Sequence, residues 1–208
     1  MKQALSQKEL LEKACRNYEA GIHLAQDYLD ARGITQAVAR RARLGVVFQP
    51  EIGHELYEGR LAIPYITKTG VVDIRFRSLS PEVEPKYMGM PGVHTRLYNV
   101  TDIEKATDWI AVCEGELDAL TLSVCVGLPA VGVAGANSWR DHYTRLLADF
   151  ERVYVFADGD SAGRQFATSL MKELPITIVQ LEDGEDVNSS YVKYGKDYLI
   201  EKAGMNEQ

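Results

Sequence analysis

The sequence is poor in cysteine and has no long apolar run. Its three cysteines, Cys15, Cys113 and Cys125, are isolated from one another, which fits neither a disulfide framework nor a four-cysteine zinc site. No apolar run approaches the roughly 20 residues that span a bilayer, and residues 1–9 lack the apolar core of a signal peptide. We therefore expect buried thiols, no zinc in this chain, no membrane partner and a cytoplasmic location.

An overall excess of positive charge is also absent. The net charge of −7 argues against nucleic acid as a partner, but residues 1–100 carry 14 Lys and Arg against 11 Asp and Glu, and residues 101–208 carry 9 against 19. The first part could therefore hold an anionic polymer. In the second part, clustered carboxylates would repel one another, and a cation would offset that repulsion.

The first part predicts helices followed by a β-hairpin. Apolar residues recur with a helical period over residues 4–31, with a possible break at Gly21, and Thr35 can cap a second helix. Residues 60–66 and 71–77 have the alternating pattern of two strands joined by a short turn. We expect a mixed α+β subdomain.

Charged side chains alternate with apolar ones along the second strand of this hairpin. Asp73, Arg75 and Arg77 occupy alternate positions, so they share one polar face of the strand. Two arginines on one face are candidate contacts for phosphate groups, and ion pairs with Asp73 and nearby glutamates are an equally good alternative. Lys86 follows on a segment punctuated by Pro and Gly, residues 84–92, which can present it on an ordered loop.

The second part alternates strands and helices. Strands separated by helices form a parallel sheet with right-handed crossovers, so their carboxyl ends share one edge. We therefore predict an α/β fold: a Rossmann-like parallel sheet flanked by helices over residues 106–208, preceded by the α+β subdomain over residues 1–105. The predicted strands are residues 109–113, 129–133, 153–157 and 176–179, and the predicted helices are residues 116–125, 139–150 and 163–174.

Acidic residues follow three of the four strands. Glu114 and Asp118 follow the first strand, Asp158 and Asp160 follow the third, and a run ending in Asp186 follows the last. Asp158-Gly-Asp160 by itself is typical of a turn. Three acidic groups on neighbouring strand ends would repel one another unless divalent cations lay between them. Oxygen ligands alone favour Mg²⁺ or Mn²⁺ over zinc.

The same segments resemble the Toprim motifs, in the form found in bacterial DnaG-type primases. Those motifs are shared with topoisomerases, OLD-type nucleases and RecR-like proteins, whereas four upstream segments resemble the primase subdomain that precedes Toprim and favour a primase. The Toprim-like segments are residues 112–120, 156–164 and 182–188, and the upstream segments are residues 28–34, 59–64, 76–79 and 85–88.

The resemblance implies roles for individual residues. It implies that Glu114, Asp158 and Asp160 are the catalytic carboxylates, and that Asp118 and Asp186 join them in binding two or more Mg²⁺ or Mn²⁺ ions. A single-stranded DNA template and ribonucleoside triphosphates are the implied partners. The residues matched to nucleic-acid or nucleotide contacts are Arg75, Arg77, Lys86, Arg96 and Arg164, and for Arg164 a salt bridge is the alternative.

The implied activity is that of a DNA primase, which makes short RNA primers by two-metal nucleotidyl transfer. Such primases also carry a zinc ribbon and a helicase-binding region. Residues 1–20 hold one cysteine, so we expect a replicative helicase or a zinc-ribbon protein to act in trans, in a bacterial or phage-infected cell. Asn188 stands where the family often has aspartate, which leaves that metal position open. The alternatives are a Toprim nuclease and a RecR-like DNA-binding module without catalysis.

Overall fold

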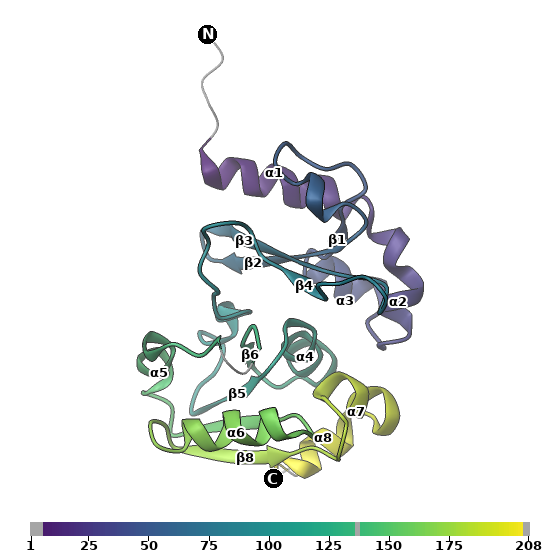
Figure 1. The fold of residues 1–208 in the computed structure, drawn as a ribbon. Coiled ribbons are helices and arrows are strands. Elements are labelled where there is room, and N and C mark those ends of the chain that lie inside the picture. Colours follow the sequence, from purple (N-terminus) through teal and green to yellow (C-terminus); the bar gives the residue numbers. More distant parts are fainter. Residues whose placement is uncertain (1–5, 136–137, 206–208) are drawn as a thin grey trace. The chain divides into compact units, whose positions relative to one another are not determined.

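The chain folds into two compact units, Met1–His94 and Thr95–Gln208 (Figure 1). The computed structural model describes residues 6–135 and 138–205. Within those ranges, no helix is both long enough and apolar enough to cross a bilayer.

The first unit packs helices against a four-stranded antiparallel sheet of order β1-β2-β3-β4. Ser6 and Glu9 form a capping box that starts α1. The buried side chains of Leu11 and Tyr18 on α1 share a core cluster with residues of the sheet. The elements are α1 (Gln7–Glu19), η1 (Ile22–Ala25), α2 (Gln26–Asp30), α3 (Gln36–Arg41), β1 (Gly45–Val46), η2 (Glu55–Tyr57), β2 (Leu61–Thr67), β3 (Gly70–Arg77) and β4 (Tyr87–Met88).

The long helical pattern of residues 4–31 is divided in the structure. α1 ends at Glu19, with Ala20 as its C-cap, and the chain continues through η1 into α2. A β-carbon on Gly21 would lie 2.5 Å from the Phe48 ring and 2.8 Å from the Val46 carbonyl oxygen, so glycine permits the close approach of β1 at this point. The predicted cap at Thr35 is confirmed, because its hydroxyl accepts a hydrogen bond from the Val38 amide.

The predicted hairpin is also confirmed, with one difference at Asp73. Arg75 and Arg77 are half-buried on β3 as expected, but Asp73 is buried. It lies opposite the buried Tyr65 of β2, and its Oδ1 accepts a hydrogen bond from the Ile74 amide. Asp73 therefore does not belong to an exposed polar face.

The second unit contains the predicted parallel sheet, with strand order β6-β5-β7-β8. The elements are η3 (Val100–Asp102), β5 (Trp109–Cys113), α4 (Glu116–Leu120), the π-helical segment η4 (Thr121–Val126), β6 (Ala130–Gly132), α5 (Asp141–Leu147), β7 (Arg152–Ala157), α6 (Ser161–Leu170), β8 (Ile176–Gln180), α7 (Val187–Tyr194) and α8 (Lys196–Lys202).

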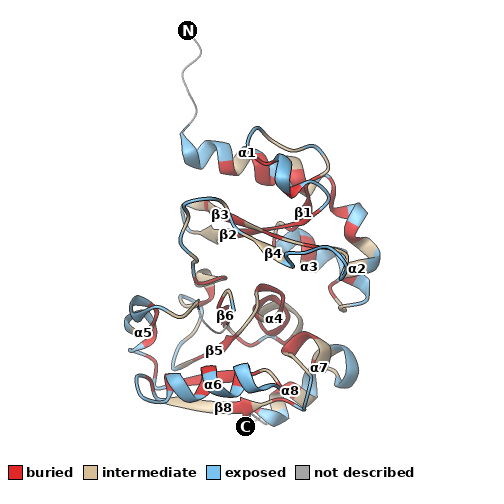
Figure 2. Ribbon diagram, viewed as in Figure 1, coloured by how far each residue is buried: buried red, intermediate tan, exposed pale blue. Residues whose placement is uncertain are grey.

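The central strands β5 and β7 are buried, whereas the edge strand β8 is half-exposed (Figure 2). Val153 and Val155 of β7 share one core cluster with Leu147 of α5 and Phe166 of α6. Phe156, at the intervening position of β7, is also buried. α4, η4, α7 and α8 pack against one another.

In the sequence, the first unit ends at His94 and the second begins at Thr95, whereas the expected boundary followed residue 105. Tyr98 pairs with Gly132 of β6 in an antiparallel bridge. The buried carboxylate of Asp102 accepts hydrogen bonds from the Ser123 hydroxyl and from the Ala130 amide. These bonds fix residues 95–105 to the second unit.

Two C-terminal helices, α7 and α8, were not predicted. Asp186 caps α7, and Asp186 and Ser189 form a capping box. This signal was present in the sequence, but it lies within the acidic run that we interpreted as metal ligands.

Candidate active site

Glu114 and Asp158 follow two neighbouring strands at the point where the strand order reverses. The chain leaves β5 toward β6 on one side of the sheet, and leaves β7 toward β8 on the other. In open α/β sheets, ligands bind in the crevice beyond the carboxyl ends of the strands at such a point. The Glu114 Oε1 and Asp158 Oδ1 atoms are buried and have no hydrogen-bond partner. Two buried carboxylate oxygens without hydrogen-bond partners favour a bound cation or a proton.

The pKa of Asp158 reflects its burial and the negative charges around it. Burial is the largest cause that raises it, to about 8, and the charges of Asp118, Glu114, Asp186 and Asp160 add to the rise. Burial and the charge of Asp160 likewise raise the pKa of Glu114, although the Asp158 backbone amide opposes this. The structure therefore brings together the five carboxylates predicted from the sequence closely enough to interact.

Three of these carboxylates also have structural roles. The Asp160 Oδ1 caps α6 by accepting from the Gly163 amide at 2.8 Å, and the Asp186 Oδ1 caps α7 by accepting from the Ser189 amide at 2.6 Å. The Asp118 Oδ1 accepts from the Asn188 amide at 2.9 Å. Helix caps hold the carboxylates of Asp160 and Asp186 in fixed positions beside the strand ends.

Glycine is required at two positions around these carboxylates. A β-carbon on Gly159 would lie 1.7 Å from the Glu182 carbonyl oxygen, and one on Gly163 would lie 2.5 Å from the Asp158 carbonyl oxygen and 2.9 Å from the Glu114 Oε1. Any larger residue at Gly159 would push the turn Asp158–Asp160 away from the β8–α7 loop, residues 181–186.

The potential metal ligands of this site are carboxylate oxygens. Within the described ranges, no group of three or more His, Cys, Asp or Glu side chains forms a ready-made metal site. The unpartnered oxygens of Glu114 and Asp158 and their mutual repulsion fit a hard cation, which prefers oxygen ligands. These oxygen donors therefore fit a hard divalent cation.

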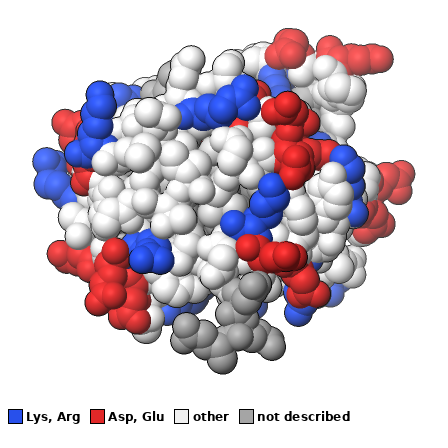
Figure 3. All heavy atoms as spheres, turned by 90° about the horizontal axis from the view of Figure 1, so that it is seen from below, with Lys and Arg blue, Asp and Glu red and all other residues white. Residues whose placement is uncertain are grey.

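Two glutamates of the acidic run are bound by side chains of the C-terminal helices. The Glu182 Oε1 accepts from Lys202 Nζ at 2.8 Å and from the Tyr198 hydroxyl at 3.1 Å, and the Glu185 Oε1 pairs with Lys193 Nζ at 2.7 Å. Figure 3 shows acidic and basic side chains interspersed on one face. Asp186 is thus the member of this run that raises the pKa of Asp158.

Asn188 is buried and binds its neighbours through hydrogen bonds. Its side-chain Nδ2 donates to the Thr121 Oγ1 at 3.0 Å, and the Thr121 hydroxyl donates to the Leu117 carbonyl oxygen at 2.8 Å. The side-chain amide of Asn188 therefore joins α7 to the start of η4.

Three of the predicted nucleic-acid residues gather in the first unit around Tyr87. The guanidinium carbons of Arg75 and Arg77 lie 5.1 and 4.9 Å from the Tyr87 ring centroid, and Lys86 Nζ lies 6.0 Å from it. Arg77 also donates a hydrogen bond to the Tyr87 hydroxyl. Cations grouped with an aromatic ring are typical of single-stranded nucleic-acid sites.

A cavity of about 350 Å³ adjoins this group, and Arg77 and Lys86 line it. Tyr28 and Arg32 line it too, with the Arg32 guanidinium carbon 3.8 Å from the Tyr28 ring centroid. We did not single out these two residues from the sequence. The available signal was their spacing of four, although Arg32 lies just beyond the end of α2.

The remaining two predicted residues lie in the second unit. Arg164, near the start of α6, pairs with Asp183 at 3.6 Å, which is the alternative considered from the sequence. Arg96 is exposed, and its charge and that of Arg140 lower the pKa of Tyr143, which burial raises. The predicted nucleic-acid residues are therefore divided between the two units.

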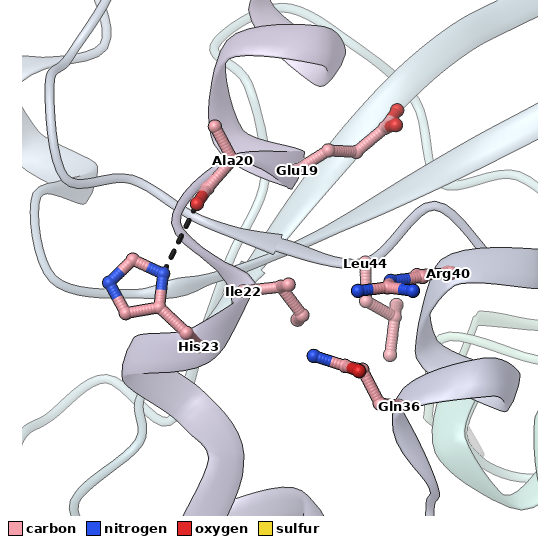
Figure 4. Close-up of a pocket in the computed structure, with 7 residues that line it drawn as sticks. All are labelled: Glu19, Ala20, Ile22, His23, Gln36, Arg40 and Leu44. Carbon is pink, nitrogen blue, oxygen red and sulfur yellow. Dashed lines mark hydrogen bonds between the residues drawn. The ribbon is translucent and has the colours of Figure 1, made fainter.

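A further cavity of the first unit, of about 590 Å³, lies between η1 and α3. Arg40 and Gln36 point into the space beside Ile22, while the Glu19 carboxylate turns away (Figure 4). Glu19 is paired with Arg43 at 2.7 Å.

Comparisons with known proteins agree with this architecture. The model of the Toprim-like family matches residues 111–191. The Gene 57 protein of Mycobacterium phage D29 is 42% identical over 153 residues, which cover 71% of this chain and 99% of that protein. The DNA primase of Buchnera aphidicola is 24% identical, over 90% of this chain and 41% of the primase. The chain thus spans about two fifths of that primase.

Two solved structures share the fold. The DnaG catalytic core has a TM-score of 0.79 and 22% identity, covering 96% of this chain and 79% of that one. The DnaG primase catalytic domain bound to single-stranded DNA has a TM-score of 0.77 and 21% identity, covering 95% of this chain and 80% of that one.

Proposed function

The chain belongs to the Toprim superfamily, in the form found in DnaG-type primases, and we propose on this premise that it synthesises short RNA primers on single-stranded DNA. The observation that carries the proposal is the pair of buried, unpartnered oxygens of Glu114 and Asp158 at the strand-order reversal. A site that only stabilised the fold would have those oxygens hydrogen-bonded.

Glu114 and Asp158, with Asp118, Asp160 and Asp186 beside them, are the residues that would hold two Mg²⁺ or Mn²⁺ ions. When bound, such ions activate a 3′-hydroxyl and stabilise the leaving pyrophosphate. The protein holds the carboxylates in place. The caps of α6 and α7 fix Asp160 and Asp186, and the backbone amide of Asn188 fixes Asp118. No side chain is required as a dedicated base.

Arg75, Arg77 and Lys86 would bind phosphate groups of the template or of a ribonucleoside triphosphate. The Tyr87 ring lies at their centre, and aromatic rings beside cations are typical of sites for single-stranded nucleic acid. Arg96 is exposed and able to add a further phosphate contact, whereas Arg164 would first have to leave Asp183. Contacts of this kind bind the backbone without reading sequence, so affinity falls as salt rises.

The experiment is primer synthesis on single-stranded DNA with labelled ribonucleotides and Mg²⁺ or Mn²⁺, with and without an added zinc-ribbon protein. We expect labelled oligoribonucleotides from the wild type and none from Glu114→Gln or Asp158→Asn. Degradation of the DNA without synthesis would favour a nuclease instead. DNA binding with neither reaction would favour a non-catalytic module of the RecR-like kind.

A further inference from the structure

Lys193, Lys202 and Tyr198 hold the two glutamates that do not face the carboxylate site. Lys202 and Tyr198, both on α8, bind the Glu182 carboxylate, and Lys193 on α7 binds that of Glu185. These side chains therefore tie the β8–α7 loop to the C-terminal helices by its two glutamates.

The main chain of the same loop builds one side of the turn Asp158–Asp160. The Gly159 amide donates to the Glu185 carbonyl oxygen at 2.8 Å, and the Gly184 amide donates to the Gly159 carbonyl oxygen at 2.9 Å. The Glu182 carbonyl oxygen lies against the α-carbon of Gly159, where a β-carbon would be 1.7 Å away. A shift of the loop would therefore move Gly159, and with it the carboxylates on either side.

We propose that Lys193, Lys202 and Tyr198 are positioning residues for the metal-binding carboxylates Asp158 and Asp160, acting through the β8–α7 loop. The inference rests on the proposed function, because the ions concerned are those of the primase site. The three side chains contact Glu182 and Glu185, and would act on the site through these glutamates. They keep Glu182 and Glu185 turned toward α8 and α7 and hold the main chain of the loop against Gly159.

Loss of positioning and loss of charge have opposite effects on metal affinity, which makes the inference testable. Removing two positive charges near an acidic site strengthens cation binding by simple electrostatics. Releasing the loop weakens it. We expect the variant carrying Lys193→Ala and Lys202→Ala to bind Mn²⁺ about 3- to 10-fold more weakly by calorimetry, the size that two exposed ion pairs can supply. Arginine at both positions should restore binding, and Tyr198→Phe should weaken it about 2-fold.

The matched control is Lys196→Ala, which removes an exposed positive charge from α8 outside these contacts. It should bind Mn²⁺ as tightly as the wild type or slightly more tightly. Unchanged or tighter binding by the double variant overturns the inference. If the double variant does not fold, Tyr198→Phe alone decides, because its loss of one hydroxyl leaves the helix packing in place.

Amide hydrogen exchange at Gly159 in the metal-free protein gives a second readout that does not depend on primer synthesis. Exchange should be faster in the double variant than in Lys196→Ala, and equal rates overturn the inference. A wild type that binds Mn²⁺ but makes no primers would refute the proposed function. It would leave this comparison of variants intact, so the two failures are distinguishable.

Discussion

The Asp118 Oδ1 accepts a hydrogen bond from the backbone amide of Asn188 at 2.9 Å, although the two residues are 70 positions apart in the sequence. This bond joins the segment after β5 to the start of α7. One carboxylate oxygen of the site is therefore also a structural contact, and the side chain of Asn188 is directed to Thr121.

We expect Asn188→Asp to destabilise the metal-free protein by about 1–3 kcal/mol, because the buried side chain loses its donor to Thr121 and gains a charge near Asp118. Thermal unfolding in EDTA measures this. Thr121→Val, which removes the acceptor, should destabilise by a similar amount. If Asn188→Asp is as stable as the wild type, the side-chain amide of Asn188 does not hold α7 in place.

The raised pKa of Asp158 predicts a pH dependence of stability. The folded-state pKa is about 8, and a carboxyl group in the unfolded chain has a pKa of about 3.9. Between these values the folded protein holds more protons, so the free energy of unfolding falls as pH rises from about 4 to about 8, by at most about 1.4 kcal/mol per pH unit. Below pH 4 and above pH 8 this contribution is constant.

Urea unfolding in EDTA across this pH range measures the effect. Asp158→Asn should gain stability relative to the wild type as pH rises, whereas Asp149→Asn, an exposed residue before β7, should follow the wild type. Parallel profiles for Asp158→Asn and the wild type would mean that Asp158 ionises normally.

Gly159→Ala should disrupt the site, because its β-carbon would overlap the Glu182 carbonyl oxygen. Overpacking typically costs about 1–3 kcal/mol, and displacement of Asp158 and Asp160 should also abolish measurable Mn²⁺ binding. Gly89→Ala is the control, because no atom lies within 4 Å of its added β-carbon. Normal Mn²⁺ affinity in Gly159→Ala would contradict the close packing of the two loops.

Lys86→Ala and Arg77→Ala should weaken binding of single-stranded DNA, and each should lower the slope of log affinity against log salt by about 0.7 if one phosphate contact is lost. Fluorescence anisotropy at several salt concentrations measures both effects. Arg41→Ala, an exposed arginine of α3, should leave the slope unchanged. Slopes equal to that of the wild type would remove Lys86 and Arg77 from the nucleic-acid site.

The sheet of the second unit could be predicted because its strands are short, continuous apolar runs. Val153 to Ala157 is buried on both faces, and the acidic residues directly after such runs lie at one edge by the geometry of parallel strands. The same reasoning predicts that Glu114 and Asp158 lie on neighbouring strand ends.

The sequence could not predict which carboxylates of the acidic run, residues 182–186, face the site. Glu182 and Glu185 have the same local pattern as Asp186, but their partners Lys202 and Lys193 lie 20 and 8 residues further along the chain. Which carboxylate faces the site depends on the packing of α7 and α8. The bridge from Tyr98 to Gly132, which joins residues before 105 to the parallel sheet, is likewise a tertiary contact that sequence pattern does not reveal.

The rate of RNA primer synthesis on single-stranded DNA by Glu114→Gln, relative to the wild type, tests the central claim most directly. The control is Glu151→Gln, an exposed carboxylate beside the opposite end of β7. We expect Glu114→Gln to be slower by about 100-fold or more, because a charge that holds the ions is lost, and Glu151→Gln to be as fast as the wild type. Equal rates for Glu114→Gln and the wild type would contradict the account.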